Sequence, residues 1–110
     1  AITMVVFRNY QWGAEKRNTT LWYDNNFVGT ELNRKVSYAG IAKACGVEGV
    51  VVRTQEELKG AIESSCKAQS NGVTTFIEVI LNQELGEPFR SDAMKAPESI
   101  AGIDLADMQP

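Results

Sequence analysis

Three short apolar runs, each rich in β-branched residues, constrain the fold of this chain more than any other feature. They cover residues 2–7, 48–53 and 74–81, and their length and composition are typical of strands buried on both faces of a parallel sheet. The segments between the runs are too long for hairpin turns and contain helical patterns. This alternation predicts an α/β fold with three parallel strands, joined by right-handed crossovers, in which the last strand is central.

Two helices are predicted between these strands. Residues 37–45 have an apolar side, and Gly46 follows as a helix stop. Thr54 and Glu57 have the spacing of a capping box, in which each side chain accepts a hydrogen bond from the other residue's backbone amide. The helix that begins there carries an apolar stripe and is expected to end at the Asn-Gly pair at 71–72. The stripe consists of Leu58, Ala61, Ile62, Ser65 and Cys66.

The remaining segments give weaker patterns. Residues 11–26 fit either a turn or two of helix or a loop, and residues 27–35 are expected to be irregular. After Asn82 the chain becomes polar and contains all 3 of its prolines, so we expect an irregular tail that lies over the surface. The predicted organisation is one domain over residues 1–95 and a tail over residues 96–110.

Composition excludes several classes of function. The 110 residues carry a net charge of -3, which gives no reason to expect nucleic acid or an anionic membrane as a partner. No stretch approaches the roughly 20 apolar residues that span a bilayer, so we expect a cytoplasmic protein. The sequence has no histidine, which excludes a histidine triad and a histidine zinc site. Cys45 and Cys66 are predicted to be buried thiols, with a disulfide or a metal role as the alternative.

The chain begins directly in a strand pattern. The apolar run at residues 2–7 follows no initiator methionine and no polar segment, which is typical of a piece cut from something longer. A sheet of three strands also exposes at least one strand edge and one flank. We therefore expect further elements of the sheet to lie upstream.

The end of the first predicted strand carries the candidate site. In open parallel sheets, ligands lie beyond the carboxyl ends of the strands, and the sequence there reads Arg-Asn-Tyr-Gln-Trp-Gly over residues 8–13. The side-chain oxygen of Asn9 and a nearby backbone carbonyl are hard oxygen ligands, of the kind that bind Mg²⁺ together with a diphosphate. An asparagine in an ordinary turn is the alternative at this position.

Longer stretches around this motif resemble the C-terminal part of the thiamine diphosphate-dependent enzymes. The resemblance extends over residues 2–94 and is carried by residues 5–33, 46–62 and 74–93. Within the acetolactate synthase-like group of these enzymes, the stretches Asn-Tyr-Gln-Trp-Gly-Ala-Glu-Lys and Glu-Leu-Gly-Glu-Pro-Phe-Arg resemble the sulfoacetaldehyde acetyltransferase family. The fold implied is the diphosphate-end, Rossmann-like domain of such an enzyme.

The resemblance also implies a set of site residues. In these enzymes a Gly-Asp-Gly turn and a later asparagine hold Mg²⁺ against the diphosphate of the cofactor. Carried over, Asn9 is a side-chain ligand of the metal, Gln11 is a backbone-carbonyl ligand, and Gly13 lets the chain pass close to the cofactor. This sequence lacks the Gly-Asp-Gly turn, the pyrimidine-binding domain and its activating glutamate. The chain alone is therefore expected to be inactive, and no catalytic side chain is assigned to it.

The activity implied for the longer enzyme is the conversion of sulfoacetaldehyde and phosphate into acetyl phosphate and sulfite. Thiamine diphosphate and Mg²⁺ are the implied cofactors, and a homo-oligomer is the expected assembly. One alternative is another acetolactate synthase-like enzyme or a 2-oxoacid decarboxylase. The alternative from a different class is a small non-catalytic α/β interaction module, which would need a complete hydrophobic surface of its own.

Several other residues near the motif have two interpretations each. Four aromatic residues are expected to pack in a core or an interface, with closure over the cofactor as the alternative: Trp12, Trp22, Tyr23 and Phe27. A run of charges is expected to be solvated, with contact to phosphate or sulfonate as the alternative: Glu15, Lys16 and Arg17. Arg90 is expected to form a surface salt bridge, although its guanidinium would also suit an anionic substrate.

Overall fold

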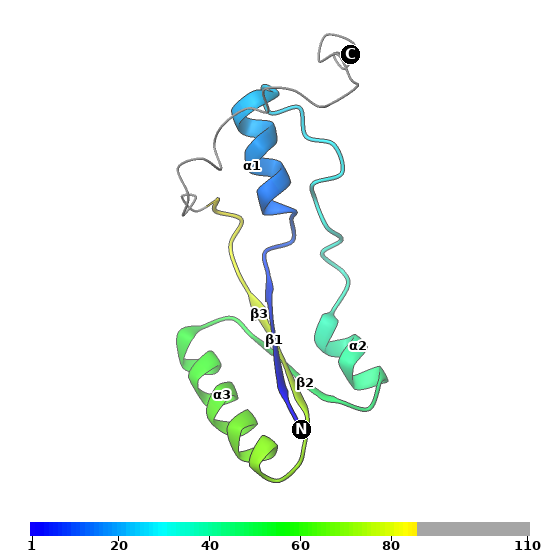
Figure 1. Cartoon of the computed structure of the whole chain (residues 1–110), viewed down its shortest axis with the longest axis vertical. Helices are drawn as coiled ribbons and strands as arrows, with labels where there is room; N and C mark the ends of the chain where they lie inside the picture. Colours follow the sequence, from blue (N-terminus) through cyan, green and yellow to red (C-terminus); the bar gives the residue numbers. More distant parts are fainter. Residues whose placement is uncertain (86–110) are drawn as a thin grey trace, which may run out of the picture.

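A computed structural model describes residues 1–85 and shows one open sheet of three parallel strands with helices around it (Figure 1). In chain order the elements are β1 (Thr3–Arg8), α1 (Gly13–Trp22), α2 (Tyr38–Ala44), β2 (Glu48–Val52), α3 (Gln55–Ser70) and β3 (Thr75–Ile80). Helices α2 and α3 lie on opposite sides of the sheet, and α1 lies beyond the carboxyl end of β1. The predicted α/β class is confirmed. The predicted domain boundary at residue 95, the tail and Arg90 lie outside the described residues.

Strand β3 forms the centre of the sheet, as its apolar sequence predicts. The strand order is β1-β3-β2, and both neighbours run parallel to β3. Between the sheet and α3, the buried side chains of β3 pack in a small core that contains Val52, Leu58, Ala61, Ile77 and Val79. Of the three described strands, β3 is therefore the most completely buried.

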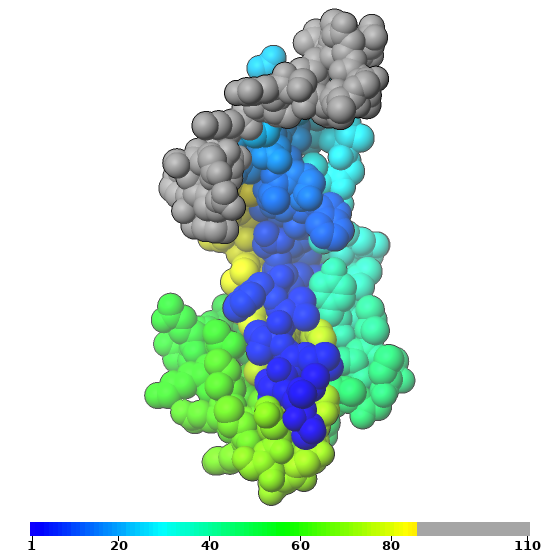
Figure 2. Space-filling model, in the orientation of Figure 1, coloured from blue at the N-terminus to red at the C-terminus, as the bar shows by residue number. Residues whose placement is uncertain are grey.

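Strand β1 lies at one edge of the sheet and is exposed along that side. The exposed fractions of Val5 and Phe7 are 42% and 67%. Figure 2 shows β1, in dark blue, at the surface between α3 and α2. The predicted exposed edge is confirmed. The prediction that both faces of this strand are buried is wrong for the described residues. No element among them covers the side chains of Val5 and Phe7.

The helix ends follow the predicted local rules. Ser37 caps α2 by accepting a hydrogen bond from the Gly40 amide at 3.1 Å. At α3, the Thr54 hydroxyl accepts from the Glu57 amide at 3.1 Å, and the Glu57 carboxylate accepts from the Thr54 amide at 3.3 Å, so the capping box is confirmed. Gly72 then ends the helix with φ 77°. Within residues 1–85, no helix combines the length and the apolar character needed to cross a membrane.

The buried side of α3 is narrower than the predicted stripe. Ser65 is buried and Ala61 is half-buried, whereas Ile62 is 45% exposed and Cys66 is exposed. Cys45 at the end of α2 is exposed as well, so the prediction of two buried thiols is wrong. The physical reason is that each helix meets only a three-stranded sheet. The flanks of its apolar stripe therefore extend past the surface that is available.

Part of the segment at residues 11–26, which fitted either a helix or a loop, forms helix α1. This helix has 10 residues and none of them is buried. It therefore has no buried apolar face, and no apolar stripe predicted it from the sequence. Asp24 and Asn25 follow in the left-handed region, with φ 45° and 60°, which short polar side chains tolerate. Residues 27–35 then contain no helix or strand, as predicted, apart from one isolated bridge between Glu31 and Gln11.

Gly49→Ala is expected to lower the free energy of unfolding by about 1–3 kcal/mol. A Cβ at Gly49 in β2 would lie 2.7 Å from the backbone carbonyl oxygen of Ala39, so α2 would have to move away from the sheet. Gly60→Ala is the matched control, because a Cβ there meets no atom within 4 Å. It should stabilise α3 by about 0.5–1 kcal/mol. Urea unfolding of both variants checks this, and equal shifts would contradict the close packing of α2 on β2.

Candidate functional site

The candidate site lies where the loops after β1 and β3 meet a third segment of the chain. The Trp12 amide donates to the Thr30 carbonyl at 2.8 Å. On the other side, the side-chain amide of Gln11 donates to the Gln83 carbonyl at 2.9 Å. Two segments that are distant in sequence therefore hold the loop after β1 in place at the carboxyl end of the sheet, where parallel α/β folds bind ligands.

Asn9 follows β1 directly and starts a tight turn. Its Oδ1 accepts a hydrogen bond from the Gln11 amide at 3.3 Å, and the side chain is half-buried rather than enclosed in the core. Tyr10 has φ 61°, a left-handed conformation that is uncommon for a residue with a side chain. The Tyr10 carbonyl accepts from the Leu32 amide at 2.8 Å. Strained backbone of this kind persists where its surroundings hold it, and it is frequent at ligand sites.

Gln11 carries unused hydrogen-bond acceptors. The residue is only 4% exposed, yet its Oε1 has no partner in the part of the chain that the structure describes. No backbone amide within residues 1–85 donates to its main-chain carbonyl. Buried polar atoms are normally paired, so an unpaired one calls for an explanation such as a bound ion or water. The Oγ1 of the adjacent buried Thr30 is unpaired in the same way.

Gly13 leaves space beside these groups at the start of α1. A Cβ at this position would lie 3.5 Å from Nδ2 of Asn9 and 3.6 Å from Cδ2 of Leu85. Those are ordinary contact distances, so a larger side chain would fill the space next to the Asn9 carboxamide. The three residues predicted for the site, Asn9, Gln11 and Gly13, therefore lie together.

A buried ion pair lies directly behind the turn. The Arg8 guanidinium, at the end of β1, pairs with the carboxylate of Glu78 in β3, and their exposed fractions are 7% and 0%. The second carboxylate oxygen of Glu78 accepts from the Ser37 hydroxyl at 3.1 Å and from the Ala39 amide at 2.9 Å. The pair thus connects the two strands that end at the site to the first turn of α2.

The environment keeps Glu78 ionised. Burial on its own would raise the pKa of this carboxyl group. The Ala39 amide, the Arg8 guanidinium and the Ser37 hydroxyl all donate to the charged form, and together they lower the pKa of Glu78 below its ordinary value. The sequence interpretation missed this pair. The signal was a single acid inside the apolar run at residues 74–81 and a single arginine at the end of the first run.

The charges and aromatic residues near the turn differ in part from their predicted roles. Lys16 forms an ion pair with Glu31, and Arg17 donates to the Leu85 carbonyl at 3.1 Å, so both are held by the protein rather than simply solvated. Trp12 and Tyr23 are 55% and 59% exposed, which excludes core packing among the described residues. Phe27 is 42% exposed, and Trp22 is half-buried. Interface packing and closure over a cofactor stay predictions.

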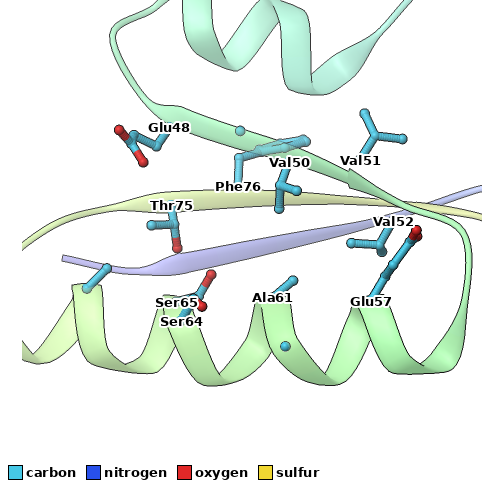
Figure 3. A pocket seen from close by; sticks show the side chains of 13 residues that line it. Glu48, Val50, Val51, Val52, Glu57, Ala61, Ser64, Ser65, Thr75 and Phe76 are labelled. Carbon is cyan, nitrogen blue, oxygen red and sulfur yellow. The ribbon is translucent and has the colours of Figure 1, made fainter.

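A separate hollow of about 570 Å³ lies between β2 and α3 (Figure 3). Small side chains such as Ala61 and Ser65 line it, and the carboxylate of Glu57 at one end already accepts hydrogen bonds from the backbone amides of Arg53 and Thr54. None of the residues of the turn after β1 belongs to its lining. Within residues 1–85, no three Asp, Glu or Cys side chains come together as a metal site. The hollow is therefore distinct from the candidate site.

The open parallel sheet with a strained, polar turn beyond its first strand has the arrangement of an α/β domain that binds ligands at the carboxyl ends of its strands. A comparison with protein families matches residues 1–79 to "Thiamine pyrophosphate enzyme, C-terminal TPP binding domain". The chain therefore belongs to this C-terminal domain family of the thiamine pyrophosphate enzymes, whose cofactor is the same compound as thiamine diphosphate. The resemblance inferred from the sequence is confirmed.

The individual relatives are more specific. A protein of Rhodobacter capsulatus named sulfoacetaldehyde acetyltransferase is 69% identical over 110 residues, which are 100% of this chain and 19% of that protein. The protein of the same name from Roseovarius nubinhibens is 68% identical over 109 residues, 99% of this chain and 18% of the relative. The protein of that name from Castellaniella defragrans is 48% identical over 97 residues, which are 87% of this chain and 16% of that relative. The chain thus spans about a fifth of the length of these relatives or less.

Proposed function

We propose that this chain holds the diphosphate end of thiamine diphosphate in an acetyltransferase that converts sulfoacetaldehyde and phosphate into acetyl phosphate and sulfite. The observation that carries the proposal is the 69% identity, over all 110 residues, to a relative named for this activity. The activity belongs to the longer enzyme, because the chain corresponds to 19% of that relative. We also propose that the longer enzyme is a homo-oligomer.

The proposal includes Mg²⁺ as the ion that joins the diphosphate to the protein. Mg²⁺ prefers about six oxygen ligands in octahedral geometry and commonly uses one or two protein ligands plus phosphates. Asn9 would supply its side-chain oxygen, and Gln11 would supply its main-chain carbonyl, which has no amide donor among residues 1–85. The turn at Tyr10 brings these two groups to one loop. The residues present therefore fit the ion, and the remaining ligands would be the diphosphate, water and residues outside this chain.

The chain's own residues bind and orient, and none of them has a role at the reacting carbon. When bound, thiamine diphosphate supplies the carbanion chemistry of acyl transfer. Gly13 leaves the loop open beside the Asn9 carboxamide, so a diphosphate can approach the backbone closely. Lys16 and Arg17 stabilise α1 against Glu31 and the backbone of Leu85. Their charges are thereby fixed near the site.

A chimera tests the proposal directly. The aligned 110 residues of the Rhodobacter capsulatus relative are replaced by this chain, and sulfite release and acetyl phosphate formation are measured with sulfoacetaldehyde and phosphate. We expect activity close to that of the unmodified relative, and activity that depends on added thiamine diphosphate and Mg²⁺. A chimera that folds and assembles like the relative but releases no sulfite would contradict the proposal. Turnover of a 2-oxoacid without sulfite release would favour the alternative enzyme of the same superfamily.

The chain on its own is expected to self-associate or to bind a dye for apolar surfaces. Several large apolar residues are exposed, including Ile2 at 56%, Phe7 at 67% and Ile41 at 55%. Extended apolar surface on a soluble protein usually marks an interface. Sedimentation and dye fluorescence at a fixed, moderate concentration check this. A monomer that binds no dye would favour the independent interaction module instead.

A further inference from the structure

We propose that Arg8 is a positioning residue for the turn formed by Asn9, Tyr10 and Gln11, and that it keeps the two proposed metal ligands in the orientation that binds Mg²⁺. The inference rests on the proposed function, because it concerns how these ligands are presented. Arg8 is the last residue of β1 and immediately precedes Asn9 in the chain.

The Arg8 guanidinium is held from several directions. One nitrogen, Nη1, pairs with the fully buried Glu78. The other, Nη2, donates to the backbone carbonyls of Asn33 at 3.4 Å and Arg34 at 3.1 Å. Its position is therefore fixed by the central strand and by the segment that leads into α2, independently of any ligand.

This fixed guanidinium supports the strained residue of the turn, together with the Arg34 guanidinium, whose carbon lies 5.2 Å from the centre of the Tyr10 ring. The ring of Tyr10 lies 4.4 Å from the guanidinium carbon, and the ring of Tyr38 lies 5.2 Å from it. Stacking of this kind is favourable for a desolvated arginine. Tyr10 has φ 61°, a backbone conformation that is unfavourable for a residue with a Cβ unless surrounding contacts stabilise it. If the stack is lost, Tyr10 can return to negative φ, and the Gln11 carbonyl that follows it rotates away.

Lysine cannot replace arginine in this arrangement. A guanidinium is planar, so it can donate in its plane to Glu78 and to two carbonyls while its face contacts the ring of Tyr10. An ammonium group keeps the charge and the ion pair with Glu78 but loses the flat face and the second nitrogen. Arg8→Lys therefore separates the support of the turn from the neutralisation of the buried carboxylate.

The test uses the chimeric enzyme in its cofactor-free form. Thiamine diphosphate bound at equilibrium is measured by dialysis over a series of Mg²⁺ concentrations, and no turnover is required. Arg8→Lys is expected to raise the Mg²⁺ concentration for half-maximal retention by about tenfold, the range seen when a residue that orients a metal ligand is replaced. Arg53→Lys is the matched control and should leave the requirement unchanged, since Arg53 follows β2, is exposed, and has no hydrogen bond to the turn within residues 1–85.

A second substitution distinguishes positioning from general stability. Asparagine adopts left-handed conformations more readily than tyrosine, so Tyr10→Asn should need less support from Arg8. In the Arg8→Lys background, Tyr10→Asn is therefore expected to lower the Mg²⁺ requirement back toward that of the parent chimera. If Arg8 and Tyr10 only stabilise the fold, the second substitution removes more packing and raises the requirement further. That result would overturn the proposal.

Two further arms keep the test decisive. If Arg8→Lys does not fold, Tyr10→Val with Arg8 intact takes its place, because a β-branched residue strongly resists positive φ. It should raise the Mg²⁺ requirement, and an unchanged value would overturn the proposal. Asn9→Ala identifies which inference has failed. If Asn9→Ala raises the Mg²⁺ requirement and Arg8→Lys does not, only the role of Arg8 is wrong. If Asn9→Ala leaves the Mg²⁺ requirement unchanged, the proposed metal site itself is wrong.

Discussion

Asn9→Ala in the chimeric acetyltransferase is expected to raise the Mg²⁺ concentration for half-maximal retention of thiamine diphosphate by at least about tenfold. The substitution removes one of about six oxygen ligands, and a water must take its place without the protein holding it. Cofactor retention should change far more than substrate preference, because the diphosphate end is remote from the reacting carbon. Calorimetric titration with thiamine diphosphate in Mg²⁺ measures the loss.

Gln11→Ala is the matched control for this loss. The proposed ligand at this position is a backbone carbonyl, which the substitution leaves in place. The variant loses the side-chain hydrogen bond to the Gln83 carbonyl and the packing of a buried side chain, so stability should fall by about 1–3 kcal/mol, while metal affinity should fall much less than in Asn9→Ala. Equal losses in the two variants would contradict this division of roles. An unchanged affinity in Asn9→Ala would exclude Asn9 as a ligand.

Glu78→Gln is expected to lower the free energy of unfolding by about 3–5 kcal/mol, the largest stability effect in the chain. The variant leaves the Arg8 guanidinium buried without its counter-charge, and the NH2 group of its carboxamide cannot accept a hydrogen bond from either Arg8 or the Ala39 amide, whichever of the two it faces. A small open sheet has little stability to lose. Denaturant unfolding, followed by circular dichroism at fixed chain concentration, should show the variant largely unfolded.

The double variant Arg8→Met/Glu78→Leu distinguishes the effect of losing the whole ion pair from the effect of leaving one buried charge without its partner. Removing both charges leaves no buried ion, and apolar replacements of buried pairs are often neutral or stabilising. Most of the stability lost in Glu78→Gln should therefore return. If the double variant is as unstable as the single one, the packing around Glu78 matters more than its charge, and this account of the pair is wrong.

The stability that Glu78 contributes should depend on pH in one direction. Its pKa in the folded chain lies below the ordinary value of 4.5, so the unfolded chain takes up a proton first as the pH falls. The contribution is complete above about pH 4.5 and is lost as the pH falls through the lower, folded value. The unfolding free energy of the native chain should therefore fall relative to that of the double variant in acid. A pH-independent difference between the two proteins would contradict the lowered pKa.

Local sequence rules predicted the parts of the fold that depend on local chemistry. The capping box of Thr54 and Glu57 and the exit at Gly72 involve residues close together in sequence, and the structure confirms both. The central position of β3 follows from its composition alone. By contrast, α1 has no apolar stripe, and what holds it is remote: Glu31 for Lys16 and the Leu85 carbonyl for Arg17. No periodicity in its own sequence could have revealed it.

The candidate site likewise has one part that the local sequence predicted and one part that it did not. Asn9 was predicted because a polar turn after an apolar strand is visible in the sequence, whereas Gln11 and Gly13 were assigned through the resemblance to the thiamine diphosphate-dependent enzymes. The partnership of Arg8 with Glu78 joins residues 70 positions apart, and it becomes visible only when β1 and β3 are adjacent. The prediction that Cys45 and Cys66 are buried was wrong for a related reason. Whether a residue on a helix is buried depends on the width of the surface that covers the helix, and the periodicity of the sequence does not measure this width.

The strand order β1-β3-β2 has a consequence for synthesis on the ribosome. Among residues 1–85, β1 and β2 each pair only with β3, so neither can join this sheet until β3, which ends at Ile80, has left the exit tunnel. Until then the edges of β1 and β2 that will pair with β3 stay open, and closing the β1–β3 pairing requires a loop that runs from Arg8 to Thr75. Such exposed edges are where nascent chains aggregate or recruit chaperones. The last of the three described strands to be made is therefore the one that joins two separate segments with open edges into a sheet.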